Sequence, residues 1–421
     1  MNKTLLGILT LAIVPCMLSG FEIKELTVPK HILIPPSISE DGKSFVYTAI
    51  DGKTDKPAIF VSYLNPDGTF SKPVTAVTSE ATAKGLKKHI ISFQGQHGLW
   101  EPTQLRPEGG LNSPIIQGNI ITFSATLENY KRGVFYARKW RDGKWRVTPI
   151  ALQGQAVPDK KGVTFHNFDA PYITMNSEAI FLASLSDRAD AVYKYKIPEE
   201  DSITHGKPVL LCKSNDKIFN FWDISVYRGN FALRAETTSG DIFIYVYDAK
   251  KKMLVRTSPD NYASLPKGAT VVPLGPSLYK GRVAFSTYYR SHGKDSVYAI
   301  YSNVYDSFFA EPAAISGELI ESVNSKFVKV GNPTLYIKGK RIYIVFMATL
   351  TEGFKTPGVY LAEINGDNVK ISALAAPGQK LSNSKTVESA ATGAVSIRDG
   401  IIPMAIKYDN GNNVIAYIRI Y

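Results

Sequence analysis

Apolar and polar residues alternate along residues 119–140, NIITFSATLENYKRGVFYARKW, in two runs separated by a polar segment. A period of two is typical of a β-strand that buries one face. The pattern therefore predicts a β-hairpin, with Phe123 and Ala125 on the same side of its first strand.

The same pattern, a large apolar residue followed two positions later by a smaller one, recurs along the chain. The copies are Tyr47/Ala49, Phe123/Ala125, Phe181/Ala183, Leu233/Ala235, Phe285/Thr287, Phe346/Ala348 and Met404/Ile406. The last copy is the most degraded. Their spacing is roughly 50 to 60 residues, with a longer interval between the first two, and such a period indicates a repeat architecture.

The residues before and after each copy follow a common pattern. An apolar run with an aliphatic residue precedes a turn that contains glycine, or Asn176 in the third copy, and these residues tolerate positive φ. Downstream, a β-branched residue precedes an aromatic one in six copies: Ile59-Phe60, Val134-Phe135, Val192-Tyr193, Ile242-Phe243, Val297-Tyr298 and Val359-Tyr360. A fourth apolar run follows in most copies. Seven repeats of four antiparallel strands predict a seven-bladed β-propeller, with a solenoid of sheets as the alternative.

The two ends of the repeat array complement each other. The seventh repeat stops after its third strand, NVIAYIRIY, while FEIKELTVP precedes the first repeat as a surplus strand. We expect this N-terminal strand to complete the last blade and close the ring, which removes an open edge.

The units APYITMNSEAIFLASLSDRADAVYKY and GPSLYKGRVAFSTYYRSHGKDSVYAIY resemble the blades of secreted bacterial β-propeller proteins, which run P-x-I-x-x-G-x-V-A-F-x-A and then G-V-Y. The resemblance covers nearly all of residues 21–421 and implies the propeller fold and export. Because the motif consists of packing residues, it implies nothing about activity; propellers host lectins, glycosidases, lyases, peptidases and scaffolds.

Residues 1–20 have the organisation of a secretory signal peptide: Lys3, an apolar run from Leu5 to Val14, then Ser19 and Gly20. The run is too short to span a membrane, so we expect a periplasmic or extracellular protein without a transmembrane segment after cleavage. Cys16 leaves lipidation as an alternative, although Pro15 precedes it. Cys212 is then the one remaining cysteine, and we expect it to be a buried small hydrophobe.

The formal charge is +12 and no long block of like charges occurs, so we expect the excess to be spread over the surface of a monomer. Such a charge suits anionic glycans or envelope polymers, or serves solubility alone. Export argues against a nucleic-acid partner.

Candidate binding residues come from the loops that lead into the innermost strands, since such loops converge at one mouth of the central channel. The longest is an insertion at residues 80–112 between repeats one and two. The candidates are Trp100, Arg106, Glu108, His166, Asp169, Asn220, Asp223 and Glu388. Aromatic faces, carboxylates and amides suit sugars, but they also occur on any solvent-facing rim. Trp222 is expected in the core.

These observations favour a binding scaffold for an anionic glycan or envelope polymer, or for a partner protein on the same face. The alternative is a glycosidase or lyase that uses carboxylates such as Glu108, Asp169, Asp223 and Glu388. NPDGTF and WRDGKW lack the serine of sialidase turns. Hydrolase, zinc, calcium and phosphate-loop motifs are absent from the sequence, so no metal site and no cofactor is predicted.

Overall fold

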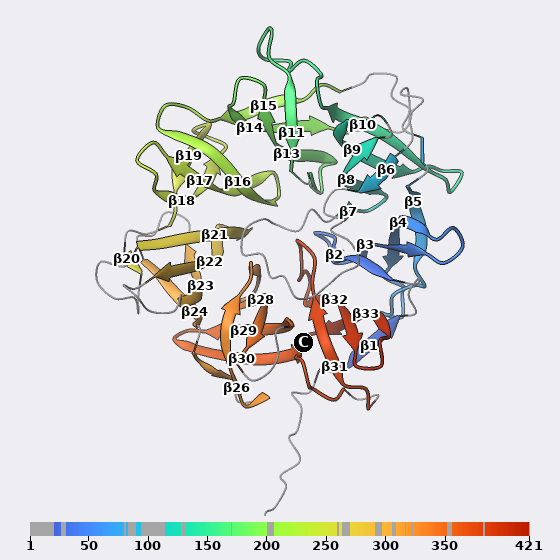
Figure 1. Cartoon of the computed structure of the whole chain (residues 1–421), viewed down its shortest axis with the longest axis vertical. Coiled ribbons are helices and arrows are strands. Elements are labelled where there is room, and N and C mark those ends of the chain that lie inside the picture. Colours follow the sequence, from blue (N-terminus) through green and yellow to red (C-terminus); the bar gives the residue numbers. More distant parts are fainter. Residues whose placement is uncertain are drawn as a thin grey trace, which may run out of the picture.

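The structure is a ring of seven four-stranded antiparallel blades around one axis (Figure 1). This computed structural model describes residues 21–26, 31–79, 81–82, 90–93, 114–127, 129, 131–169, 171–199, 206–258, 261–262, 270–290, 297–304, 309–315, 317–320, 323–351, 356–381 and 384–420. The predicted seven-bladed propeller is confirmed. In these ranges no helix is long and apolar enough to cross a bilayer.

The first four blades contain the following strands, from the axis outwards. Blade one has β2 (Ile32–Ile38), β3 (Ser44–Asp51), β4 (Lys56–Tyr63) and β5 (Val74–Thr78). Blade two has β6 (Ile90–Phe93) with β7 (Ile115–Gln117), then β8 (Ile120–Leu127), β9 (Arg132–Lys139) and β10 (Trp145–Leu152). Blade three has β11 (Phe165–Phe168) with β12 (Tyr172–Ile173), then β13 (Glu178–Leu185), β14 (Asp190–Lys196) and β15 (Val209–Lys213). Blade four has β16 (Ile218–Tyr227), β17 (Asn230–Thr237), β18 (Ile242–Asp248) and β19 (Met253–Arg256).

The remaining blades follow the same order. Blade five has β21 (Thr270–Tyr279), β22 (Arg282–Arg290), β23 (Val297–Val304) and β24 (Phe309–Ile315), with β20 (Asn261–Tyr262) parallel to the start of β24. Blade six has β26 (Ser325–Val330) with β27 (Thr334–Lys338), then β28 (Arg341–Leu350), β29 (Gly358–Asn365) and β30 (Asn368–Ala375); β25 (Leu319–Ile320) pairs with β26. Blade seven has β31 (Val387–Ala391), β32 (Ile401–Tyr408), β33 (Asn413–Arg419) and β1 (Ile23–Leu26).

The N-terminal strand closes the ring, as the sequence predicts. β1 pairs antiparallel with β33, from Ile23 opposite Ile418 to Leu26 opposite Ile415. In Figure 1 the blue β1 lies beside the red β33. Glu25 adds side-chain contacts, because its carboxylate accepts a hydrogen bond from the Tyr408 hydroxyl and lies 3.2 Å from Lys385 Nζ. The two ends of the chain are therefore held in one sheet.

The repeated anchor residues form the core of the blades. All seven, from Tyr47 to Met404, are buried and lie on the second strand of their blade. In five blades the anchor stacks on an aromatic residue of the third strand, with ring centroids 5.6 to 6.3 Å apart: Tyr47 on Phe60, Phe123 on Phe135, Phe181 on Tyr193, Phe285 on Tyr301 and Phe346 on Tyr360. Such pairs stabilise the sheets beyond the burial of their area.

In blades four and five the aromatic residue opposite the anchor is not that of the β-branched–aromatic pair. Leu233 lies opposite Tyr245 and Phe285 opposite Tyr301, so the aromatic partners are these tyrosines and not Phe243 and Tyr298. Phe243 and Tyr298 are only half-buried. Both third strands carry several aromatic residues, and the β-branched–aromatic pattern alone does not fix which of them faces the anchor.

Candidate functional site

The innermost strand is interrupted at the same level in every blade, opposite the anchor residue. In blades two, three and six two short strands, such as β11 and β12, pair with a single second strand. In blades one, four and five the strand continues but its register shifts, as between Trp222 and Ile224. Residues at an interruption are freed from regular pairing, so a ring of variable positions surrounds the axis at mid-height.

The interruptions of blades three and four hold two predicted site residues. Asp169 follows β11 and donates its backbone N–H to Leu182 O. Asp223 is the bulged residue of β16, with a φ of 46°. The left-handed region is accessible to aspartate at moderate strain. Asp169 and Asp223 therefore lie outside the regular strand pairing, on neighbouring blades.

Asp223 forms a buried ion pair with Arg234 of β17. Its Oδ2 lies 3.0 Å from Arg234 Nε, and the two side chains are only 5% and 10% exposed. The guanidinium carbon of Arg234 also lies 4.9 Å from the centre of the Trp222 ring. Burial at this depth is tolerated because the charges compensate each other, and the pair fixes the orientation of Asp223.

Whereas Asp223 is paired with a guanidinium, the carboxyl of Asp169 is affected mainly by burial and by neighbouring carboxylates. Burial raises the pKa of its carboxyl to about 6, the charges of Asp223 and Asp190 contribute to the increase, and Arg234 opposes it. These influences place Asp169 near the Asp223–Arg234 pair. One carboxyl that retains its proton to about pH 6 thus adjoins one that is paired with a guanidinium.

The raised pKa of Asp169 predicts a pH-dependent stability. Below the ordinary aspartate pKa of about 3.9 the carboxyl is protonated in both states, and above about 6 it is ionised in both. Between these values the folded state binds more protons, so stability decreases as pH rises. From pH 4 to pH 7 we expect wild type to lose about 1–3 kcal/mol of unfolding free energy relative to Asp169→Asn. Urea unfolding at pH 4, 5, 6 and 7 measures this; parallel pH profiles would contradict the assignment.

Asp190 connects blades three and four beside this pair. Its Oδ2 accepts a hydrogen bond from the backbone N–H of Phe221, 2.9 Å away, and burial raises its pKa. Since Phe221 precedes Trp222 and Asp223 on β16, Asp190 helps to position the site.

The other predicted residues are only partly brought together. Asn220 lies on β16 near Asp223, and its Nδ2 donates to Glu236 Oε2 at 2.9 Å. His166 is exposed on β11. Glu388 lies on β31 in blade seven, where its Oε1 is 2.6 Å from Lys407 Nζ. Trp100, Arg106 and Glu108 lie outside the described residues.

Trp222 and the segment 80–112 differ from what the sequence predicts. Trp222 is half-buried against Arg234 and is not a core residue; its neighbour Phe221, 3% exposed, takes the core position. Part of the segment assigned to the 80–112 insertion belongs to blade two itself, because β6 pairs with β8. β6 and β7 therefore together form the inner strand of blade two, although they are far apart in the sequence.

Arg234 was missed in the sequence, although a signal exists. The residue after the anchor is Thr48, Ser124, Leu182, Arg234, Ser286, Met347 and Ala405 in the seven repeats. Only the fourth is charged, and the same repeat carries Asp223 in its inner strand. Two charges of opposite sign that appear in one repeat, at positions otherwise uncharged, indicate a buried pair.

Arg398 and Tyr172 were also missed. Arg398 of blade seven is 3% exposed, lies 4.9 Å from the centre of the Tyr279 ring and donates from Nη1 to Leu335 O and Ile397 O. Burial raises the pKa of the Tyr172 hydroxyl, Asp169 and Asp223 raise it further, and Arg398 lowers it. Tyr172 thus lies within the electrostatic range of Asp169 and Asp223 on one side and of Arg398 on the other.

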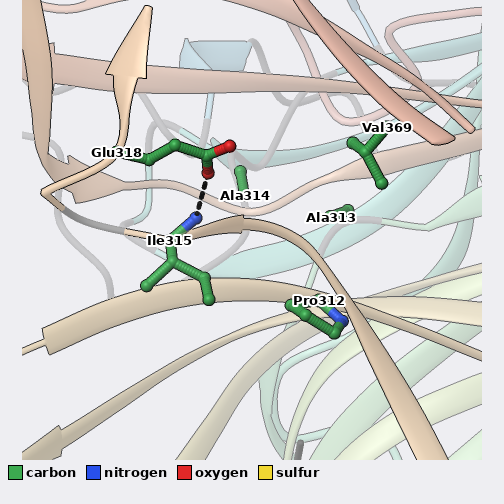
Figure 2. A pocket seen from close by; sticks show the side chains of 6 residues that line it. All are labelled: Pro312, Ala313, Ala314, Ile315, Glu318 and Val369. Carbon is green, nitrogen blue, oxygen red and sulfur yellow. Dashed lines mark hydrogen bonds between the residues drawn. The ribbon is translucent and has the colours of Figure 1, made fainter. Parts of the chain in front are cut away.

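A hollow of about 340 Å³ lies away from these residues, between the outer strands of blades five and six (Figure 2). It is lined by Pro312, Ala313, Ala314, Ile315, Glu318 and Val369. The carboxylate of Glu318 accepts the backbone N–H of Ile315 at 3.1 Å. Of the described residues that line the hollow, Glu318 is the one with a polar side chain, and its carboxylate is used to stabilise a turn. We therefore do not place the functional site there. Within the described ranges no group of three or more His, Cys, Asp or Glu could hold a metal ion.

Comparison with known proteins gives distant structural similarities and no sequence match. No protein-family profile and no curated protein sequence matches the chain. Among solved structures, it resembles a Trypanosoma rangeli sialidase (11% identity, TM-score 0.38, 82% of this chain and 56% of that chain). It also resembles the β-propeller domain of the Pyrococcus furiosus Trilobed protease (10%, 0.42, 72% and 80%) and TolB from Acinetobacter baumannii (11%, 0.37, 89% and 79%). The chain spans little more than half the length of the sialidase.

Proposed function

We propose that the protein is a binding propeller whose ligand, a hydroxyl-rich glycan, docks at the inner strands of blades three and four. The observation that carries the proposal is the juxtaposition of Asp169 with the Asp223–Arg234 pair. Carboxylates accept hydrogen bonds from sugar hydroxyls, and a guanidinium supplies forked donors. Export, predicted from residues 1–20, belongs to the same proposal, because envelope polysaccharides would be met outside the cytoplasm.

The charge of the site bears on the class of glycan. Asp169, Asp190 and Asp223 are opposed by one guanidinium, that of Arg234. This excess of carboxyl groups favours a neutral glycan over the anionic polymer expected from the net charge of the whole chain. A protein partner on the same face is the alternative occupant.

A glycan array on residues 21–421 at physiological salt tests the proposal. We expect saturable binding to a neutral glycan family, and Asn220→Ala should weaken it about tenfold, the effect of one lost hydrogen bond. Glu388→Gln in blade seven is the matched control and should bind as wild type does. Absence of binding, or equal loss in both variants, would refute this site and favour a protein partner.

A polysaccharide-active enzyme is the second candidate, and the different pKa environments of two neighbouring carboxyls favour it. A carboxyl with a pKa of about 6 can act as a general acid near neutral pH, while an ion-paired carboxylate stabilises positive charge. Asp169→Asn should then abolish release of reducing ends or unsaturated products while glycan binding persists. Turnover by wild type should fall as pH rises above about 6. Undiminished turnover by Asp169→Asn would exclude this residue as the acid.

A further inference from the structure

The two faces of the ring differ in charge. In every blade the turns that join the first strand to the second and the third strand to the fourth lie on one face, because the strands are antiparallel and consecutive. We name this the double-turn face. The turns between second and third strands, and the links between blades, lie on the opposite face, from which the inner strands begin.

Basic residues are concentrated on the double-turn face. They occur in or beside its turns in all seven blades: Lys43, Lys72, Arg138, Lys139, Arg141, Lys144, Arg146, Lys194, Lys196, Lys207, Arg228, Lys250, Lys251, Lys252, Lys280, Arg282, Lys338, Lys340, Arg341, Lys370 and Arg419. The acidic residues described there are fewer: Glu22, Glu40, Asp41, Asp67, Asp142, Glu178, Glu199, Asp248, Glu363, Asp367 and Asp399.

On the opposite face acids and bases are nearly balanced among the described residues. Many are joined in ion pairs, such as Lys160 and Lys213 with Asp187, at 3.0 and 2.9 Å. Among the described residues the positive excess therefore lies mainly on the double-turn face, away from the loops that lead into the inner strands, and not evenly over the surface as expected.

Of the eight large apolar side chains that are exposed among the described residues, five lie on the same basic face, and Phe219, Leu319 and Val328 do not. Val209, Met253 and Val74 are 57%, 51% and 44% exposed, and each is the first residue of an outer strand at this face. Met175 and Val369, in or beside turns of this face, are also exposed. Trp140 and Trp145 flank the basic turn of blade two, where the Arg146 guanidinium lies 4.2 Å from the centre of the Trp140 ring.

We infer that the double-turn face docks on an anionic lipid surface. Basic residues near a membrane contribute through attraction to acidic headgroups, and exposed valine and methionine side chains, together with the half-buried Trp140 and Trp145, gain from insertion at the interface. A soluble polyanion would use the cations but would gain little from the apolar side chains. The combination on one face of a disc therefore favours a bilayer over a polymer. The mid-height acidic site around the axis is separate from this surface.

Charge reversal on one face at a time tests the inference. Sedimentation with phosphatidylcholine vesicles, with and without phosphatidylglycerol, measures partition at low and physiological salt. Wild type should bind only the anionic vesicles. Lys144→Glu/Lys250→Glu/Lys340→Glu changes exposed residues of the double-turn face in three blades and should reduce partition roughly a hundredfold, since each cation near the surface contributes about a factor of five.

The matched control is Lys161→Glu/Lys217→Glu/Lys326→Glu, which makes the same charge change at exposed residues of the opposite face. It should retain vesicle binding within a few-fold. Equal loss in both triple variants would overturn the inference, because net charge alone would then account for binding.

The apolar residues distinguish a bilayer from a soluble polyanion. Val209→Ser/Met253→Ser should reduce partition to anionic vesicles several-fold and leave binding to dextran sulfate unchanged. Binding to dextran sulfate without binding to vesicles would also overturn the lipid assignment. Circular dichroism melting of each variant confirms that the fold persists.

Discussion

Removal of residues 21–26 is expected to lower the free energy of unfolding by roughly 3–6 kcal/mol, because Phe21, Ile23 and Leu26 lose their packing and the β1–β33 ladder is lost. It also leaves β33 as an unpaired strand edge, and such edges pair with other chains. We therefore expect the truncated protein to form oligomers at concentrations at which the full ring is monomeric.

Light scattering after size-exclusion chromatography, together with urea unfolding, measures both effects. Glu25→Gln is the control, because it keeps the strand and changes only the contacts of this side chain, among them those with Lys385 and Tyr408; its effect should stay below about 1 kcal/mol. A truncated protein that remained monomeric and equally stable would show that the ring does not need this strand.

Replacement of Arg234 by methionine is expected to destabilise the protein by about 3–5 kcal/mol at pH 7, because it removes the guanidinium that pairs with the buried carboxylate of Asp223. The repulsion between Asp223 and Asp169 then also increases. Addition of Asp223→Asn to Arg234→Met should recover most of the loss. The recovery in a double-mutant cycle measures the coupling of the pair.

Arg228→Met provides the comparison for Arg234→Met. Arg228 has a 65% exposed side chain and lies 3.7 Å from Glu40, so its ion pair should contribute less than about 1 kcal/mol. If Arg234→Met were as mild as Arg228→Met, the Asp223–Arg234 pair would not organise the site, and the proposed binding surface would lose its support.

The sequence predicts the blades well because their burial is strictly periodic. Most anchors, such as Phe123, recur with a small residue and a turn glycine at similar offsets, and local pattern is enough to identify them. Closure by β1 follows from counting strands at the two ends. In blades four and five the β-branched–aromatic pair does not identify the aromatic residue opposite the anchor, since both third strands carry more than one aromatic residue.

The site is less predictable because it arises between blades. Asp169 and Asp223 were named as single candidates, but their relation depends on which residues leave the ladder at mid-height. Arg234 lies on the second strand of its blade, whereas the candidate residues were taken from the loops that lead into the innermost strands. The uneven charge could have been foreseen from the position of basic turns such as that of Lys250–Lys252, once the blade topology was known.

The common interruption of the inner strands has a consequence for how such a ring can be altered. In blade two, β6 and β7 both stay in register with β8 although a long stretch of chain separates Phe93 from Ile115. Chain length at that point is thus independent of the ladder on either side. The equivalent points, between Phe168 and Tyr172 or between Val330 and Thr334, are therefore natural insertion points for grafted loops. A library of such loops would vary the surroundings of the axis while the seven sheets remain a constant frame.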